Sequence, residues 1–268
     1  MLRRFRLIIS KRRTLMNGRV VITGGGSGIG QQIAQNFFNN GYRVAVCDVS
    51  KKNLHKLKNS SKDILTFHAD VTNKKDMNKF KIKVTEEFNG LDVMISNAGV
   101  AGPAGMLEAA TLKDWKNCLS VNLDGAFLSC KWAAEIMRVQ RSGLILIISS
   151  TSGLFGVPYR APYVTAKWGL IGLTKTLAME LGPFGVRVNA ICPGSVDGQR
   201  LKAILDMESK ASGIHPKEIE KKYTQAVSLR RNVKAQDIAD MALFLASDSA
   251  KQISGQAIAV DGNTERMV

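Results

Sequence analysis

The sequence predicts an α/β fold, a doubly wound and mostly parallel sheet of seven strands with helices on both faces. Short apolar segments alternate with amphipathic helical segments along the chain. Each helical segment gives the chain the crossover that two parallel strands require. The strand segments are apolar at nearly every position, which is typical of strands buried on both faces of a sheet.

The predicted strands are short apolar runs that end at glycine or at polar residues. They span residues 20–23, 44–48, 64–69, 91–96, 144–149, 186–191 and 258–260. The first strand runs directly into a glycine-rich turn, and the second ends at an aspartate. These two strand ends therefore belong to the first crossover unit of the sheet.

The predicted helices show apolar residues three and four positions apart. In the first, Ile33, Ala34, Phe37 and Phe38 share one face, and Gly41 ends the helix. Helices are expected at 31–40, from 53, and at 76–88, 115–139, 163–181 and 237–246. Residues 195–223 form a longer insertion of mixed helical character, which we expect to act as a substrate lid.

The 268 residues are 45% hydrophobic and 22% charged, which is a globular composition. A single domain over 16–268 is expected, because we find no linker or internal repeat. Residues 1–15 carry six basic residues and no acid. Three interpretations remain open for this extension: a dispensable or disordered segment upstream of a start at Met16, an organelle presequence, or a functional basic arm.

The net charge of +16 raises the question of nucleic-acid or membrane binding. Without the six basic residues of the extension, 32 basic and 22 acidic residues leave +10. The lysines are spread singly over polar stretches, and aromatic residues do not alternate with them as single-strand binding requires. We therefore expect a solvated lysine-rich surface, with neither a nucleic-acid partner nor a membrane partner. The longest aliphatic run, 144–148, is too short to span a bilayer.

Cysteine and histidine are few and widely spaced. Neither the four cysteines nor the three histidines show the spacing of a metal site or a disulfide framework. We expect no metal, and we expect reduced thiols in a cytoplasmic protein.

The turn at 23–30 has the context that a dinucleotide-binding motif needs, between a strand and an amphipathic helix. Its glycines allow the backbone to approach a pyrophosphate, and the helix N-terminus offers free N–H groups. The expected contacts from this turn are Gly24, Ser27, Gly28, Ile29 and Gly30.

Asp48 ends the second strand, about 20 residues after the glycines. A carboxylate there can accept hydrogen bonds from both ribose hydroxyls and would repel a 2′-phosphate. The expected cofactor is therefore NAD rather than NADP.

Tyr163 and Lys167 are four residues apart and share a helix face. An ammonium group close to a phenol stabilises the phenolate, so the tyrosine becomes a usable general acid/base near neutral pH. Ser150 follows the fifth strand at its carboxyl end, where open sheets bind ligands. Its hydroxyl can hold and polarise a substrate oxygen.

Further short motifs occur in a fixed order along the chain: the turn at 24–30, Asp70-Val71, Asn97-Ala98-Gly99, Asn122, the set Ser150, Tyr163 and Lys167, and Pro193-Gly194. On these residues, over about 17–263, the chain resembles the short-chain dehydrogenase/reductase family in its single-domain type. The resemblance implies a Rossmann fold that transfers hydride between a nicotinamide and a substrate carbon.

The resemblance also implies residue roles. Tyr163 would exchange the proton with the substrate oxygen and Ser150 would position that oxygen. Lys167 would lower the tyrosine pKa and hold the ribose, and Asn122 would hold a water that links the lysine to solvent. Further cofactor contacts are implied for Asp70, Val71, Asn97, Ala98, Gly99, Tyr163, Lys167, Pro193, Gly194 and Val196.

Two positions depart from the family pattern. Gly198 stands where the family usually has threonine, so a hydroxyl contact to the carboxamide is lost or comes from Ser195. Asn263 stands where the C-terminal pattern has a second glycine. Neither position belongs to the catalytic set.

The favoured function is an NAD(H)-dependent oxidoreductase that interconverts an alcohol and its carbonyl. The alternatives are an NADP(H)-dependent 3-ketoacyl-type reductase and a catalytically silent nucleotide-binding redox sensor. We expect a small-molecule substrate, and two interpretations remain open for the basic residues near it. Either Arg160 or Arg200 pairs with an anionic group of the substrate, or the charges of the lid only face solvent. The apolar residues on several sides of the helices at 115–139 and 163–181, together with the resemblance, imply a homodimer or homotetramer.

Overall fold

The computed structural model describes residues 18–266, so the predicted basic extension lies outside the described residues. Seven strands form one sheet in the order β3-β2-β1-β4-β5-β6-β7, and every neighbouring pair is parallel. This confirms the predicted fold class. The strands are β1 (Arg19–Thr23), β2 (Arg43–Asp48), β3 (Leu65–His68), β4 (Val93–Ser96), β5 (Gly143–Ile148), β6 (Val186–Pro193) and β7 (Ala257–Val260).

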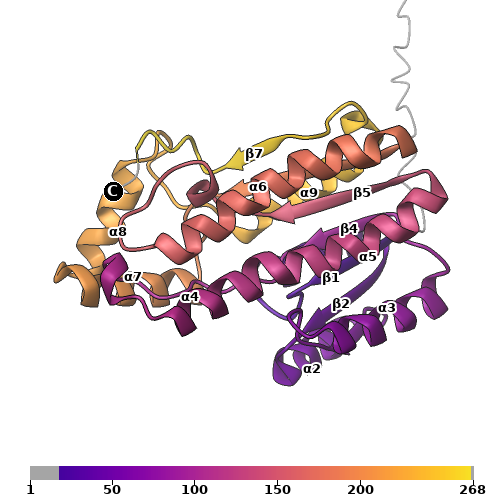
Figure 1. Cartoon of the computed structure of the whole chain (residues 1–268), viewed down its shortest axis with the longest axis horizontal. Coiled ribbons are helices and arrows are strands. Elements are labelled where there is room, and N and C mark those ends of the chain that lie inside the picture. The colour runs from indigo at the N-terminus through magenta and orange to yellow at the C-terminus, as the bar shows by residue number, and fades with distance from the viewer. Residues whose placement is uncertain (1–17, 267–268) are drawn as a thin grey trace, which may run out of the picture.

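Helices separate the strands and cover both faces of the sheet (Figure 1). They are α1 (Gly28–Asn39), α2 (Lys51–Ser60), α3 (Lys74–Phe88), α4 (Leu112–Leu119), α5 (Gly125–Gln140), α6 (Ala161–Leu181), α7 (Gln199–Ser212), α8 (Pro216–Gln225) and α9 (Ala235–Ala246). None of the helices in the described part of the chain is long and apolar enough to cross a membrane.

Two apolar layers fill the space between the sheet and its helices. One layer joins alternate strand residues such as Ile22 and Leu146 to α1 and α9. The other joins the intervening residues, such as Val21 and Ile145, to α3, α5 and α6. Because side chains alternate along a strand, consecutive strand residues enter opposite layers, and the central strands β4 and β5 are apolar at nearly every position.

The strand order reverses between β1 and β4, the switch point at which open parallel sheets bind ligands. The carboxyl ends of the strands meet at one edge, and the segment after β6 folds over that edge as α7 and α8 (Figure 1). We call residues 195–223 the lid segment. The predicted insertion is therefore two helices, separated by Gly213 in a left-handed conformation with φ of 75°.

The predicted helix at 115–139 is interrupted. The chain forms α4, then a π-helical segment over Ser120–Asp124, and then α5. Within this segment the buried Asn122 side chain donates hydrogen bonds to the carbonyl oxygens of Cys118 at 2.9 Å and Val100 at 3.0 Å. Apolar periodicity does not show such a widening, because it reports only which side of a helix is buried. π-helical segments of this kind are frequent at functional sites.

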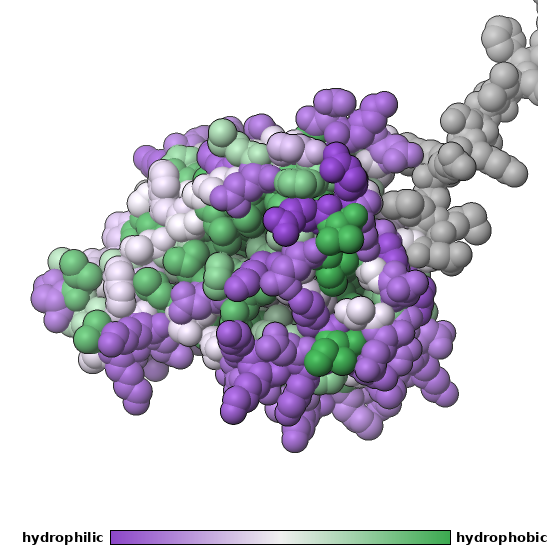
Figure 2. All heavy atoms as spheres, turned by 45° about the vertical axis from the view of Figure 1, so that its right-hand side comes forward, coloured by the Kyte–Doolittle hydropathy of each residue, from purple (hydrophilic) through white to green (hydrophobic). Residues whose placement is uncertain are grey.

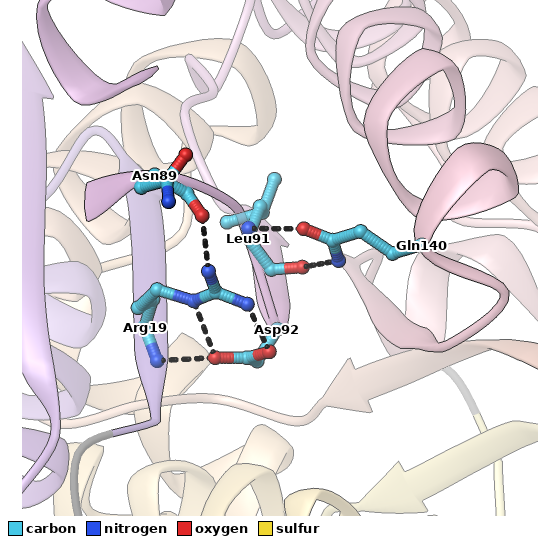
Figure 3. A network of polar contacts seen from close by, with 5 residues as sticks. All are labelled: Arg19, Asn89, Leu91, Asp92 and Gln140. Atoms are coloured by element: carbon cyan, nitrogen blue, oxygen red, sulfur yellow. Dashed lines mark hydrogen bonds and ion pairs between the residues drawn. The ribbon is translucent and has the colours of Figure 1, made fainter. Parts of the chain in front are cut away.

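At the opposite edge of the sheet, a polar network joins β1 to the start of β4 and the end of α5 (Figure 3). Arg19 donates to both carboxylate oxygens of Asp92, at 2.7 and 2.8 Å. The Gln140 side chain accepts from the Leu91 N–H at 2.9 Å and donates to the Leu91 carbonyl oxygen at 2.8 Å. Leu91 is fully buried, so Gln140 satisfies backbone groups that water does not reach.

Replacing Gln140 with alanine is expected to lower the free energy of unfolding by about 1–3 kcal/mol, because both Leu91 backbone groups lose their partner. Urea unfolding followed by circular dichroism measures the change. Gln35→Ala on α1 is the control, since that side chain has no hydrogen bond to another described residue. Equal stability of the two variants would show that the Gln140 contacts contribute nothing.

Candidate active site

A cavity of about 1080 Å³ lies at the carboxyl edge of the sheet, between the glycine-rich turn and the lid segment. Nearly all the residues predicted from sequence line it. From the cofactor set these are Gly24, Ser27, Gly28, Ile29, Gly30, Asp48, Asp70, Val71, Asn97, Ala98, Gly99, Pro193, Gly194 and Val196. Ser150, Tyr163 and Lys167 line it as well, whereas Asn122 lies behind the wall. The cavity is thus one continuous space that joins the two predicted halves of the site.

The glycine-rich turn is held in place by close backbone contacts. α1 begins at Gly28, with Ser27 as its N-cap residue. A Cβ on Gly30 would lie 2.2 Å from the Gly24 carbonyl oxygen and 2.4 Å from Asn97 Nδ2. Asn97 Nδ2 in turn donates to the carbonyl oxygens of Thr23 and Gly24, each at 3.0 Å. Asn97 therefore fixes the shape of the turn.

Asp48 lies beside this turn at the end of β2. One carboxylate oxygen accepts from the Gly26 N–H at 2.9 Å, and the other accepts from the Ser50 N–H at 2.8 Å. Each oxygen keeps a further lone pair. The carboxylate is therefore oriented into the cavity wall and can still accept hydrogen bonds from a ligand.

Ser150 and the N-terminal half of α6 bring the predicted catalytic groups together. Lys167 is buried, and its Nζ lies 5.5 Å from the centroid of the Tyr163 ring. Lys167 Nζ donates to the Ile148 carbonyl oxygen at 2.9 Å, so the end of β5 anchors the ammonium. The Ser150 hydroxyl oxygen accepts from the Ser152 N–H at 3.1 Å.

Burial alone would raise the pKa of Tyr163, but the opposing influences together are stronger. The positive charges of Lys167 and Arg200, a hydrogen bond with Ser150 and the charge of Arg160 lower the pKa of the phenol below its ordinary value of 10.0. Burial also lowers the pKa of Lys167, against the attraction of the Tyr163 phenolate. The site therefore favours a phenol that loses its proton more easily than free tyrosine.

Asn122 lies directly behind Lys167. Its Oδ1 is buried and has no hydrogen-bond partner among the described residues. A Cβ on Gly99 would lie 2.6 Å from this oxygen and 3.7 Å from Lys167 Nζ, which places both atoms around the same backbone position. The π-helical segment thus presents an uncommitted acceptor next to the ammonium group.

The two departures from the family pattern have conformational reasons. Gly198 is the N-cap residue of α7 with φ of 140°, a conformation that threonine rarely adopts. Asn263 has φ of 65°, in the left-handed region that asparagine tolerates better than other non-glycine residues. Its backbone N–H donates to Asp261 Oδ1 at 3.0 Å. Both substitutions therefore follow the local backbone.

The guanidinium of Arg160 is already paired with other groups of the protein. Its side chain is buried, and Nη1 lies 3.1 Å from Glu208 Oε1 on α7. Nη2 donates to the Ala101 carbonyl oxygen at 3.0 Å. Arg200 is exposed and donates to the Gly99 carbonyl oxygen at 3.1 Å. Of the two arginines weighed from sequence, Arg160 is thus committed to an internal ion pair.

Glu208 and Tyr223 were absent from the predicted set, although both line the cavity. The buried face of α7 consists of Leu201, Leu205 and Glu208, so the acid occupies an apolar position of the helix. That position is the signal in the sequence. A charged residue in an apolar stripe indicates a buried partner, but the sequence does not show which one.

Two hydroxyl residues close in sequence to the catalytic set, Ser149 and Tyr159, are placed differently from Ser150 and Tyr163. The Ser149 hydroxyl is buried and donates to the Lys167 carbonyl oxygen at 3.0 Å. Tyr159 has a positive φ of 63°, and its side chain faces a separate small hollow beside Pro162. Of Tyr159 and Tyr163, it is therefore Tyr163 that lines the main cavity.

Most of the apolar residues on α5 and α6 that suggested a subunit interface pack in the core of the protein instead. Trp132 and Leu170 are buried there. The apolar side chains left exposed are Phe127, Val139, Trp168 and Met179. Figure 2 shows, on the face that it presents, groups of hydrophobic residues in green between hydrophilic residues in purple.

Comparison with known proteins agrees with this geometry. A family model described as enoyl-(acyl carrier protein) reductase matches residues 24–263. An oxidoreductase of Thermotoga maritima is 37% identical over 249 residues, which cover 91% of this chain and 96% of the relative.

Two solved structures show the same fold. An NAD⁺-bound xylitol dehydrogenase has a TM-score of 0.88 and 26% identity, over 92% of this chain and 99% of that one. A variant of actinorhodin polyketide ketoreductase with NADPH has a TM-score of 0.89 and 28% identity, over 94% of this chain and 99% of that one.

The chain has a Rossmann-type α/β fold whose main cavity lies at the switch point of a parallel sheet. This chain belongs to the short-chain dehydrogenase/reductase family of oxidoreductases. Solved members of similar structure carry NAD⁺ in one case and NADPH in another.

Proposed function

We propose that this protein interconverts an alcohol and its carbonyl with NAD(H), using Tyr163 as the general acid/base. The observation that carries the proposal is the placement of Tyr163 beside Lys167 and Ser150 in the cavity that also contains the glycine-rich turn. A phenol with a lowered pKa and a hydroxyl beside it suit proton exchange with a substrate oxygen.

The residues present fit a nicotinamide dinucleotide. A Cβ on Gly28 would meet no atom within 4 Å, so the start of α1 leaves open space in front of its free N–H groups. The turn would hold the pyrophosphate, Asp48 the adenosine ribose, and Lys167 with Tyr163 the nicotinamide ribose. Asp70 and Val71 would contact the adenine, and the backbone at Asn97–Gly99 and Pro193–Val196 would line the remainder. When bound, the cofactor supplies hydride transfer to or from the substrate carbon.

The chain's own residues perform the proton chemistry in this proposal. Ser150 holds the substrate oxygen next to the Tyr163 hydroxyl. In the oxidative direction the Tyr163 phenolate accepts the hydroxyl proton, and in the reductive direction the phenol donates it. Lys167 stabilises the phenolate, and the free Asn122 Oδ1 holds a water through which the proton passes on to solvent.

Asp48 favours NAD over NADP, because its charge opposes a 2′-phosphate. A second candidate, an NADP(H)-dependent reductase of the 3-ketoacyl type, draws support from Lys56, which lines the same cavity. The ketoreductase with NADPH shares the fold. Fluorescence titration with NADH and NADPH, followed by a panel of alcohols and carbonyls, separates the two candidates. Binding of either cofactor without turnover of any compound would instead favour a catalytically silent redox sensor.

We propose a small-molecule substrate, and Arg200 is the remaining candidate to bind an anionic group on it. Its guanidinium reaches over the cavity from the first turn of α7 and has no acidic partner in the described part of the chain. The alternative from sequence, a solvated charge, fits its exposure equally well.

We further propose that α5 and α6 pair between subunits in a homodimer or homotetramer. The exposed apolar residues on these helices support the proposal, above all Val139 and Met179, each with 81% of its surface exposed. A monomeric mass by light scattering would contradict it. The four buried cysteines are free thiols, which supports a cytoplasmic location.

The rate of alcohol oxidation is expected to fall as the pH drops through the pKa of Tyr163, because the protonated phenol cannot accept the substrate proton. Since that pKa is lowered in the folded protein, the acidic limb of kcat/KM should lie below 10.0. The carbonyl reduction rate should instead fall as the pH rises through the same pKa. A pH profile in both directions measures this; limbs that move the same way would contradict Tyr163 as the acid/base.

A further inference from the structure

Arg160 connects the proposed proton-transfer group to the lid segment. It is the N-cap residue of α6, three residues before Tyr163. Its guanidinium carbon lies 4.9 Å from the centroid of the Tyr163 ring, so a positive charge sits over the phenol. Only 4% of the surface of Arg160 is exposed, so water screens this charge little.

Glu208 holds that charge from the other side. Oε1 pairs with Arg160 Nη1 at 3.1 Å, and Oε2 accepts a hydrogen bond from the Tyr223 hydroxyl of α8. Burial and the neighbouring carboxylate raise the pKa of Tyr223, so it remains a donor. Three elements, the start of α6, α7 and α8, thus meet at one buried carboxylate that lines the substrate cavity.

We propose that Glu208 is a positioning residue of this site, a carboxylate from the lid segment that holds Arg160 against the Tyr163 ring and sets how much positive charge the phenol experiences. Glu208 offsets one of the cations that favour the phenolate. Glu208 lies on α7, and Arg160 lies at the start of α6. Glu208 therefore offsets the charge of Arg160 only while α7 lies against the start of α6. The inference deepens the proposed function, on which its catalytic meaning rests.

Other groups face Tyr163 and remain unchanged in the comparison that tests this role. Lys167 faces it from its own helix, Arg200 from α7 and Ser150 from the end of β5. Cys118 of α4 lies nearby, since a Cβ on Gly102 would lie 2.6 Å from its Sγ and 3.9 Å from Tyr163 Cβ, and burial raises the pKa of its thiol. These groups are the same in wild type and in a Glu208 variant, so a change in the ionisation of Tyr163 would report the charge on Glu208.

The test is a spectroscopic titration of the phenol. Glu208→Gln keeps the shape of the side chain and an oxygen that accepts from Arg160, but removes the negative charge. The pH dependence of tyrosinate absorbance is measured for each protein against the same protein carrying Tyr163→Phe, which isolates Tyr163. We expect Glu208→Gln to lower the pKa of Tyr163 by about 0.5–1 pH unit, since Arg160 is left uncompensated.

Two controls separate charge from structure. Tyr223→Phe removes the hydrogen bond to Glu208 but keeps its charge, and it should leave the Tyr163 titration in place. Glu180→Gln, on the exposed surface of the same helix α6, changes the net charge equally and should also leave it in place. Circular dichroism establishes that each variant is folded.

An unchanged or raised Tyr163 pKa in Glu208→Gln would overturn the proposal, as would an equal shift in Tyr223→Phe. In turnover, the acidic limb of alcohol oxidation should move to lower pH by the same amount as the spectroscopic titration. The absorbance readout does not depend on activity. If no substrate is turned over, the proposed function fails while the role of Glu208 is still decided by the titration.

Discussion

Replacement of Tyr163 with phenylalanine is expected to lower kcat/KM for alcohol oxidation by about 10²–10⁴-fold, the range that a positioned general acid/base contributes. Phenylalanine keeps the ring that lies near both Arg160 and Lys167 and removes only the hydroxyl. Folding should therefore be preserved, and NADH affinity should fall by less than about tenfold, because at most one hydrogen bond to the ribose is lost. Steady-state kinetics and fluorescence titration on the same samples measure the two quantities.

Tyr159→Phe is the matched control for this variant. Tyr159 is four residues away, and its side chain faces the separate hollow beside Pro162 instead of the main cavity. Its kcat/KM should equal that of wild type. Full activity in Tyr163→Phe would remove the tyrosine from the mechanism, and an equal loss in both variants would indicate a structural effect of this segment.

Replacement of Asp48 with serine is expected to weaken NADH binding by about 10–100-fold, because the ribose loses a charged acceptor. NADPH binding should become tighter in the same variant, since the charge that opposes a 2′-phosphate is gone. The preference between the two cofactors should therefore shrink or invert. Fluorescence titrations with both dinucleotides measure it.

Asp63→Ser makes the same change in net charge at an exposed position between α2 and β3, outside the cavity. Its cofactor preference should match wild type. If Asp48→Ser keeps the wild-type ratio of NADH to NADPH affinity, Asp48 does not select the cofactor. Thermal unfolding of Asp48→Ser is measured as well, because the Gly26 and Ser50 N–H groups lose their acceptors.

The sequence was sufficient for the parts of this fold that short segments determine. The central strands β4 and β5 are buried and apolar at nearly every position, a pattern that burial on both faces of a sheet requires. The positions of Ser150, Tyr163 and Lys167 at the cavity also follow from local rules, because a strand end and one helix face fix them. Spacing along the chain is a good guide when a single element positions the residues.

The rest depends on contacts between segments far apart in sequence. The ion pair between Arg160 and Glu208 joins residues 48 positions apart, and no local pattern shows which basic residue the buried glutamate meets. The Asn122 side chain in the π-helical segment likewise donates to the Val100 carbonyl oxygen, 22 positions earlier. Sequence periodicity contains neither kind of information, since it describes one element at a time.

The chain before the lid helices is bonded to the chain after them, and this affects how a protein of this kind can change its substrate. The chain leaves the sheet after β6 and passes through α7 and α8. Ser195 and Asp197 lie just before α7, and Val233 lies after α8. Two backbone hydrogen bonds, of 2.8 and 2.9 Å, join Ser195 and Asp197 to Val233. Residues 198–232 therefore form a closed loop, because these hydrogen bonds join its two ends. Exchange of this loop for the corresponding one of a relative should leave the sheet and the proposed dinucleotide site unchanged, so new substrate preferences can arise without changes to the rest of the fold.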